Sequence, residues 1–128
     1  VVRTKFNNGI KYRVKNENLE LNPKGVITFG AENSTFFYQD EEFVSGRDIY
    51  YIDVSDKSKR VALFLVACLN FITDKYSYNY GLFPELLRKE YIMLPTKDGD
   101  NVDFEYMEKY IATIEESQQR KLEMLQAV

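Results

Sequence analysis

Residues suited to catalysis are scarce in this sequence, which contains no histidine and a single cysteine. Without histidine there is no Ser-His-Asp or Cys-His arrangement, no histidine general base and no mixed Cys/His zinc site. Cys68 lies in the apolar run 61–69, where we expect it to fill the core rather than to act as a nucleophile. A lone cysteine forms no internal disulfide, which agrees with a reducing cytoplasmic location.

Motifs for other chemistries are also missing. The chain has neither GxxxxGK[ST] nor GxGxxG, no carboxylate two residues before a lysine, and no Asn-Pro-Pro-Tyr segment. The acidic run 40–42 is more typical of a solvated loop than of a metal site, and no carboxylate pair is singled out for glycoside hydrolysis. We therefore expect a protein that is not an enzyme and that binds no cofactor or metal.

Basic residues interleaved with amides, hydroxyls and tyrosines favour a binding function instead. The net charge is −3, but basic residues concentrate in 1–24 and 57–89, and acidic residues in 32–56 and from Asp98 onward. Lysine and arginine neutralise DNA phosphates, whereas arginine and side-chain amides read base edges in the major groove. The clusters of this composition are Arg3, Lys5, Asn7 and Asn8, and the segment 75–80. Such charge blocks also fit solvated faces without a function.

Short strands and turns are expected in the first half of the chain, where they would position the first cluster. Alternating apolar and basic residues, or runs of β-branched and aromatic residues, indicate strands, and Asn, Gly and Pro indicate turns. The predicted strands are 10–14, 26–29, 36–39 and 49–54, and the predicted turns are 7–9 and 22–25.

The second half changes character. Residues 60–73 are apolar nearly all round, as in a helix buried against a sheet. The elements predicted after it are a tyrosine-rich connection at 74–83, a short helix from Pro84, a strand at 91–94 stopped by Pro95, and a loop at 97–100. The apolar run 61–72 is shorter than the roughly 20 residues of a membrane span, so we expect no membrane association.

A long helix is predicted from Asn101, which can cap it, with Asp103 and Glu105 at its positive end. Its apolar residues approximate a 3-4 spacing, broken by Gln118, which indicates a coiled-coil seam or a docking stripe. The seam residues are Phe104, Met107, Ile111, Ile114, Leu122 and Leu125. We expect this stripe to bind an external partner; the alternative is a terminal helix that lies on its own domain.

Together these elements predict an α+β fold: a twisted, mostly antiparallel sheet, one buried helix and a long C-terminal spacer-type helix. The length of 128 residues fits one compact core.

Several segments, in this order and spacing, resemble the target-recognition domain of the specificity (S) subunit of Type I restriction-modification enzymes and their Type IIB/IIG relatives. The segments of the first half are 3–4, 7–10, 25–28 and 46–50. Those of the second half are 61–65, 75–78, 92–95, 97–99 and 103–111, of which the last three are the most specific. Two departures are Gly81-Leu82, where the family usually has Gly-Arg, and the lack of a further strand and helix before Arg3. The chain therefore resembles a fragment or an abridged domain.

The resemblance implies that the chain directs partner subunits to a DNA site. Residues 1–100 would be the recognition domain, without its N-terminal portion, and residues 101–128 the spacer or coiled-coil helix. The implied partners are double-stranded DNA, methyltransferase and endonuclease subunits, and a second recognition domain or a second copy bound through the helix. The partner subunits would use S-adenosylmethionine, magnesium and ATP, and this chain would bind none of them.

The candidate DNA-binding residues are those of the resembling segments and of the nearby loops. They are Arg3, Lys5, Asn7, Asn8, Asn33, Ser34, Thr35, Arg47, Lys75, Tyr78, Asn79 and Tyr80. For Asn8 the interpretation as plain turn geometry is preferred. Two rival functions are a protein-interaction module that uses the helix seam and a carbohydrate-binding β-domain that uses the tyrosines.

Overall fold

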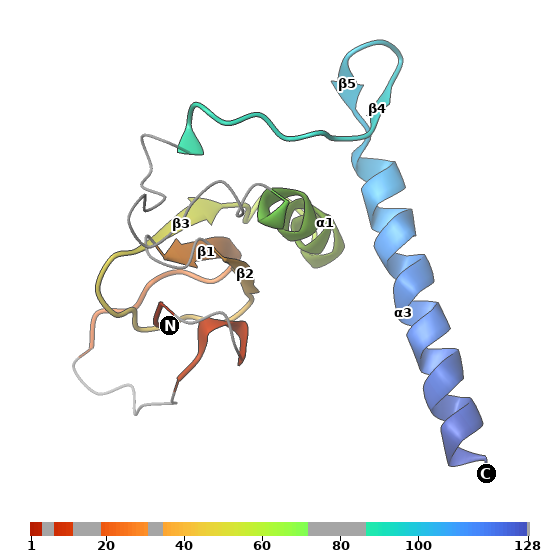
Figure 1. Cartoon of the computed structure of the whole chain (residues 1–128), viewed down its shortest axis with the longest axis horizontal. Coiled ribbons are helices and arrows are strands. Elements are labelled where there is room, and N and C mark those ends of the chain that lie inside the picture. Colours follow the sequence, from red (N-terminus) through yellow and green to blue (C-terminus); the bar gives the residue numbers. More distant parts are fainter. Residues whose placement is uncertain (4–6, 12–18, 31–34, 72–86, 128) are drawn as a thin grey trace.

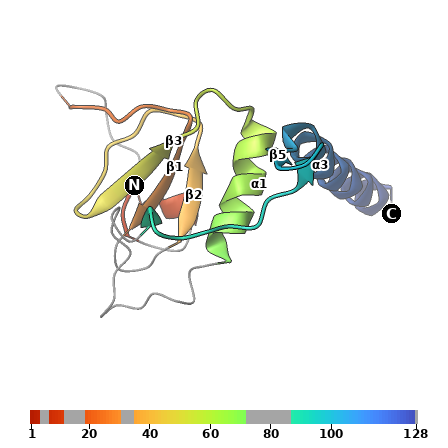
Figure 2. The same ribbon diagram turned by 90° about the horizontal axis from the view of Figure 1, so that it is seen from above.

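The fold is described by a computed structural model. It describes residues 1–3, 7–11, 19–30, 35–71 and 87–127. Within these ranges, a sheet of three antiparallel strands in the order β2-β1-β3 lies on one side of helix α1, and helix α3 lies on the other side (Figures 1 and 2). The bounds are Val26–Gly30 for β1, Phe36–Gln39 for β2, Ile49–Asp53 for β3, Lys59–Asn70 for α1 and Phe104–Gln126 for α3. This arrangement confirms the predicted α+β class.

The central strand β1 is buried along its whole length, as its β-branched and aromatic residues predict. It pairs with β2 from Val26↔Gln39 to Phe29↔Phe36, and with β3 from Val26↔Asp53 to Gly30↔Ile49. Because side chains alternate along a strand, every second residue faces α1. The buried residues of this core are Ile27, Phe29, Phe36, Val54, Ala62 and Leu69. The strands predicted at 26–29, 36–39 and 49–54 are therefore confirmed.

Helix α1 covers the core face of the sheet; a side chain caps its start, and a side chain at its end ties it to β2. At its start, the Ser58 hydroxyl accepts a hydrogen bond from the Val61 amide at 3.1 Å, as an N-cap does. At its end, the Asn70 side chain accepts from the Phe36 amide at 2.8 Å and donates to the Phe36 carbonyl at 3.2 Å. The predicted buried helix is confirmed and ends at Asn70; the expected last residues of that helix, 72–73, lie outside the described residues.

The opposite face of the sheet is covered by the N-terminal segment. It contains the short 3-10 turn η1, Asn7–Gly9, whose three residues all have positive φ (51°, 55° and 75°). Glycine is needed at its last position because φ is positive there and an added Cβ would lie 3.3 Å from the Phe37 ring. The predicted turn at 7–9 is confirmed. Ile10 and Lys11 are not in a strand, and the rest of the strand predicted at 10–14 lies outside the described residues.

One expectation for the segment before α3 is wrong. Residues 91–94 are not part of a strand; Ile92 packs against the core while Tyr91 and Met93 are each 93% exposed. The loop expected at 97–100 is confirmed for residues 98–100, while Lys97 is in a strand. This loop is the tip of a small hairpin that was not expected, formed by β4, Thr96–Lys97, and β5, Asn101–Val102.

The hairpin also moves the start of the long helix. Asn101 is in β5, and the N-cap is Asp103, which accepts from the Tyr106 amide at 3.0 Å. The Asp103 amide donates to the Pro95 carbonyl at 2.8 Å, which ties the first turn of α3 to the base of the hairpin. No helix in the described part of the chain has the length and apolar character needed to cross a membrane.

Candidate nucleic-acid interface

Three of the predicted DNA-binding residues meet at one end of the sheet. There β1 ends at Gly30, which pairs with Ile49 at the start of β3 and lies next to the start of β2. The side chain of Arg3 lies directly on Gly30, since a Cβ at this glycine would be 2.9 Å from Arg3 Cγ. Arg3, Gly30, Thr35 and Ile49 share the lining of one shallow depression. We call the group Arg3, Gly30, Thr35, Arg47 and Asp48 the Arg3–Arg47 end.

The charges at this end are arranged around one carboxylate. Asp48 Oδ2 lies 3.6 Å from Arg3 Nη1 and 3.6 Å from Arg47 Nε. The two arginines differ in exposure, because the side chain of Arg3 is 27% exposed and that of Arg47 is 87% exposed. The side chain of Arg3 is thus partly buried, whereas that of Arg47 is open to solvent.

Three connections of the chain leave from the Arg3–Arg47 end. The first follows Gly30, the second precedes Ile49, and the third follows α1, since Asn70 is bonded to Phe36 at the start of β2. Arg47 lies in the second of these connections, the one before Ile49. The other predicted loop residues belong to the first and third connections, after Gly30 and after α1. Lys5, Asn33, Ser34, Lys75, Tyr78, Asn79, Tyr80 and Gly81-Leu82 lie outside the described residues.

Asn7 and Asn8 have a different position, at the far end of β2. The Asn8 side chain donates to the Tyr38 carbonyl at 2.9 Å, and its backbone carbonyl accepts from Gln39 Nε2 at 2.9 Å. Gln39 Nε2 also lies 3.3 Å from Thr28 Oγ1. Gln39 is only 4% exposed, so these bonds satisfy a buried amide. Asn8 therefore holds the N-terminal turn on the sheet, as the turn interpretation predicts, and Gln39 was missed because its burial depends on residues 31 positions away.

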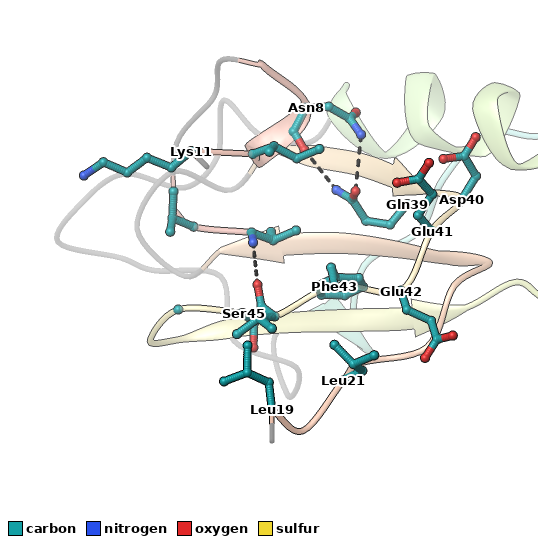
Figure 3. Close-up of a pocket in the computed structure, with 15 residues that line it drawn as sticks. Asn8, Lys11, Leu19, Leu21, Gln39, Asp40, Glu41, Glu42, Phe43 and Ser45 are labelled. Atoms are coloured by element: carbon teal, nitrogen blue, oxygen red, sulfur yellow. Dashed lines mark hydrogen bonds between the residues drawn. The ribbon is translucent and has the colours of Figure 1, made fainter. Parts of the chain in front are cut away.

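The end of the sheet opposite the Arg3–Arg47 end is acidic. Asp40, Glu41 and Glu42 follow β2, and together with Leu21 and Phe43 they are among the residues that line a cavity of about 540 Å³ (Figure 3). Lys59 Nζ donates to Asp40 at 3.0 Å, and this hydrogen bond keeps the pKa of the Asp40 carboxyl below its usual value. A phosphate would be repelled by the carboxylates at this end of the sheet.

The predicted seam of α3 divides into two parts. Met107 is completely buried where α3 packs on α1, and Ile111 is half-buried. Phe104 and Ile114 are 38% and 41% exposed. Leu122 and Leu125, near the end of the helix, are more exposed, at 52% and 73%. The first part of the helix thus lies on its own domain, and the last part leaves its apolar residues uncovered.

Asp48→Asn should raise the affinity for random-sequence duplex DNA, because the change removes the negative charge that lies 3.6 Å from both guanidinium groups. Asparagine tolerates the positive φ of 56° at this position as well as aspartate does, so the loop keeps its shape. We expect an affinity gain of several-fold at low salt and a salt dependence steeper by up to about one unit. Fluorescence anisotropy over a salt series measures both, and an unchanged salt slope would contradict the prediction.

Comparison with known proteins identifies the chain. The family described as Type I restriction modification DNA specificity domain matches residues 1–126. The chain belongs to this family. This specificity domain is 27% identical over 129 residues to the protein named Type II restriction enzyme BgcI specificity subunit S.BcgI, from Heyndrickxia coagulans. The alignment covers 98% of the specificity domain and 38% of that subunit, so the chain spans well under half of the relative's length. No solved structure gives a significant match.

Proposed function

We propose that this specificity domain binds duplex DNA in a sequence-specific manner through the Arg3–Arg47 end and itself carries out no catalysis. The observation that carries the proposal is the convergence of two arginines at the end of the sheet from which three connections leave. Exposed Arg47 would bind a phosphate, and the connections would bring side chains to the base edges. The chemistry would be done by separate methyltransferase and endonuclease subunits that the domain directs to its target.

The C-terminal helix would serve as a spacer in this function. Residues 1–100 would form the recognition unit, and residues 101–128 would hold it at a distance from a second recognition domain or a second copy. In support, the apolar residues Leu122 and Leu125 remain exposed beyond the part of α3 that packs on α1. The same exposure favours the second candidate function, a protein-interaction module without DNA affinity.

Binding to a random-sequence duplex over a salt series separates the two candidates. A DNA-binding domain should retard the duplex at low salt, and its binding constant should fall steeply as salt rises, by nearly one logarithmic unit per phosphate contact for each tenfold increase. Absence of retardation at low salt would favour the interaction module. Mapping methylated sites in the source genome, with and without the gene, should then give the target as the one methylated motif that disappears.

A further inference from the structure

The long helix α3 is attached to its domain only through its first half, in the part of the chain that the structure describes. Its contacts with α1 and with the residues just before α1 run from Phe104, whose ring centroid lies 4.7 Å from Lys57 Nζ, to Glu115. Residues 118–126 are exposed, and this part of the helix extends clear of the sheet (Figure 1). The first half of α3 is therefore packed on the domain, and the direction of the exposed second half depends on how the first half is held.

Apolar contacts fix the position of the first half of α3 on α1. Met107 is fully buried, and the ring of Phe64 meets Tyr106 and Tyr110 edge-on, with centroid distances of 6.4 Å and 5.6 Å. Apolar burial is favourable in proportion to area and has no preferred direction. These contacts hold α3 against α1, but a helix held at one patch can still pivot about it.

Arg60 supplies the directional contacts. Its Nε donates to Glu115 at 3.0 Å, and its Nη1 lies 3.4 Å from Glu108. Glu108 also accepts a hydrogen bond from Ser58, the residue that caps α1. The two glutamates are two helical turns apart, about 10 Å along the axis. A single planar guanidinium between them opposes pivoting in either direction, because each sense of rotation lengthens one of the two charge-assisted bonds.

We propose that Arg60 is a positioning residue which, together with Glu108 and Glu115, fixes the direction in which α3 leaves the sheet. The proposal rests on the proposed function for its purpose. A protein bound to the exposed half of α3 would be held at a set distance and angle from the Arg3–Arg47 end, and hence from the DNA bound there. Each ion pair is partly exposed and adds little stability on its own, so the role of the pairs is direction rather than attachment.

Distances between two spin labels on the full chain test the proposal. Cys68→Ala removes the native thiol, and Lys24→Cys and Gln118→Cys place labels on the sheet side and on the exposed half of α3. We expect a narrow distance distribution with Arg60 present and one about twofold wider in Arg60→Ala, since both directional bonds are lost. Arg60→Lys should give an intermediate width, because a point charge cannot span two carboxylates in the way a guanidinium does.

Lys109→Ala is the matched control. It removes the Lys109–Glu105 pair within α3, 3.1 Å long, and touches no contact with α1, so the distribution should stay as narrow as in the parent. A distribution in Arg60→Ala that equals that of Lys109→Ala would overturn the proposal. DNA affinity of Arg60→Ala should remain within about twofold of the parent, because the DNA-contacting end is unchanged. A parent chain that binds no DNA would contradict the proposed function while leaving the distance result intact.

Discussion

Arg47→Glu should weaken binding to random-sequence duplex DNA at low salt by at least roughly tenfold, because two units of charge change beside a phosphate and each is worth about 1 kcal/mol at 4 Å in water. The salt dependence should become shallower by about one unit as one phosphate contact is lost. The side chain of Arg47 is 87% exposed, so the melting temperature should not change. Fluorescence anisotropy at several salt concentrations and a thermal melt provide the measurements.

Lys24→Glu is the control for this charge reversal. Lys24 is exposed and lies just before β1, at the acidic end of the same sheet, and the substitution changes the net charge by the same two units. A general effect of net charge would weaken both variants equally. Equal losses in Arg47→Glu and Lys24→Glu would therefore refute the assignment of DNA binding to the Arg3–Arg47 end.

Phe36→Ala should lower the free energy of unfolding by about 3–5 kcal/mol, because a fully buried ring is replaced by a cavity. The Phe36 ring packs on Phe29 with centroids 5.3 Å apart, and the Phe36 backbone is held by Asn70 on both its amide and its carbonyl. Domains of this size have stabilities of about 5–15 kcal/mol, so the loss takes a large part of the total. DNA binding should fall in proportion to the unfolded fraction.

Urea unfolding measures this loss as a lower midpoint with an unchanged slope. Phe71→Ala is the control, because it removes the same ring at a site that is 89% exposed and should change stability by no more than about 0.5 kcal/mol. If Phe36→Ala were no more destabilising than Phe71→Ala, Phe36 could not be at the centre of the core.

The strands and the buried helix were predictable because burial leaves a clear pattern in the residues. β1 is buried along its whole length and consists mainly of β-branched and aromatic residues. The apolar run of α1 is bounded by the polar residues Ser58 and Asn70. The β4–β5 hairpin left no such pattern, since its two-residue strands are largely exposed and are paired through the backbone. The start of α3 was misplaced for the same reason: Asn101 and Asp103 are both good N-caps, and the hairpin decides between them.

The candidate site was predictable only in part. Arg3 was identified from residue type, Arg47 from the family resemblance and Thr35 from its place in a loop, and the structure brings them to one end of the sheet. Asp48 was missed, although a carboxylate directly after Arg47 could have suggested a restrained arginine. The contacts of α3 with α1 depend on pairs about 50 positions apart, such as Arg60 with Glu108, and an apolar spacing of 3-4 looks the same whether it packs inside or outside the chain.

The buried bonds of Gln39 have a consequence for how this domain can change over generations. They join the N-terminal turn, β1 and β2 at the end of the sheet away from Arg47, and none of them uses a residue of the connections at the other end. Substitutions, insertions or transplanted segments in those connections should leave the frame folded. New DNA targets could then be acquired by exchanging loops, while the sheet and helix that hold the loops stay the same.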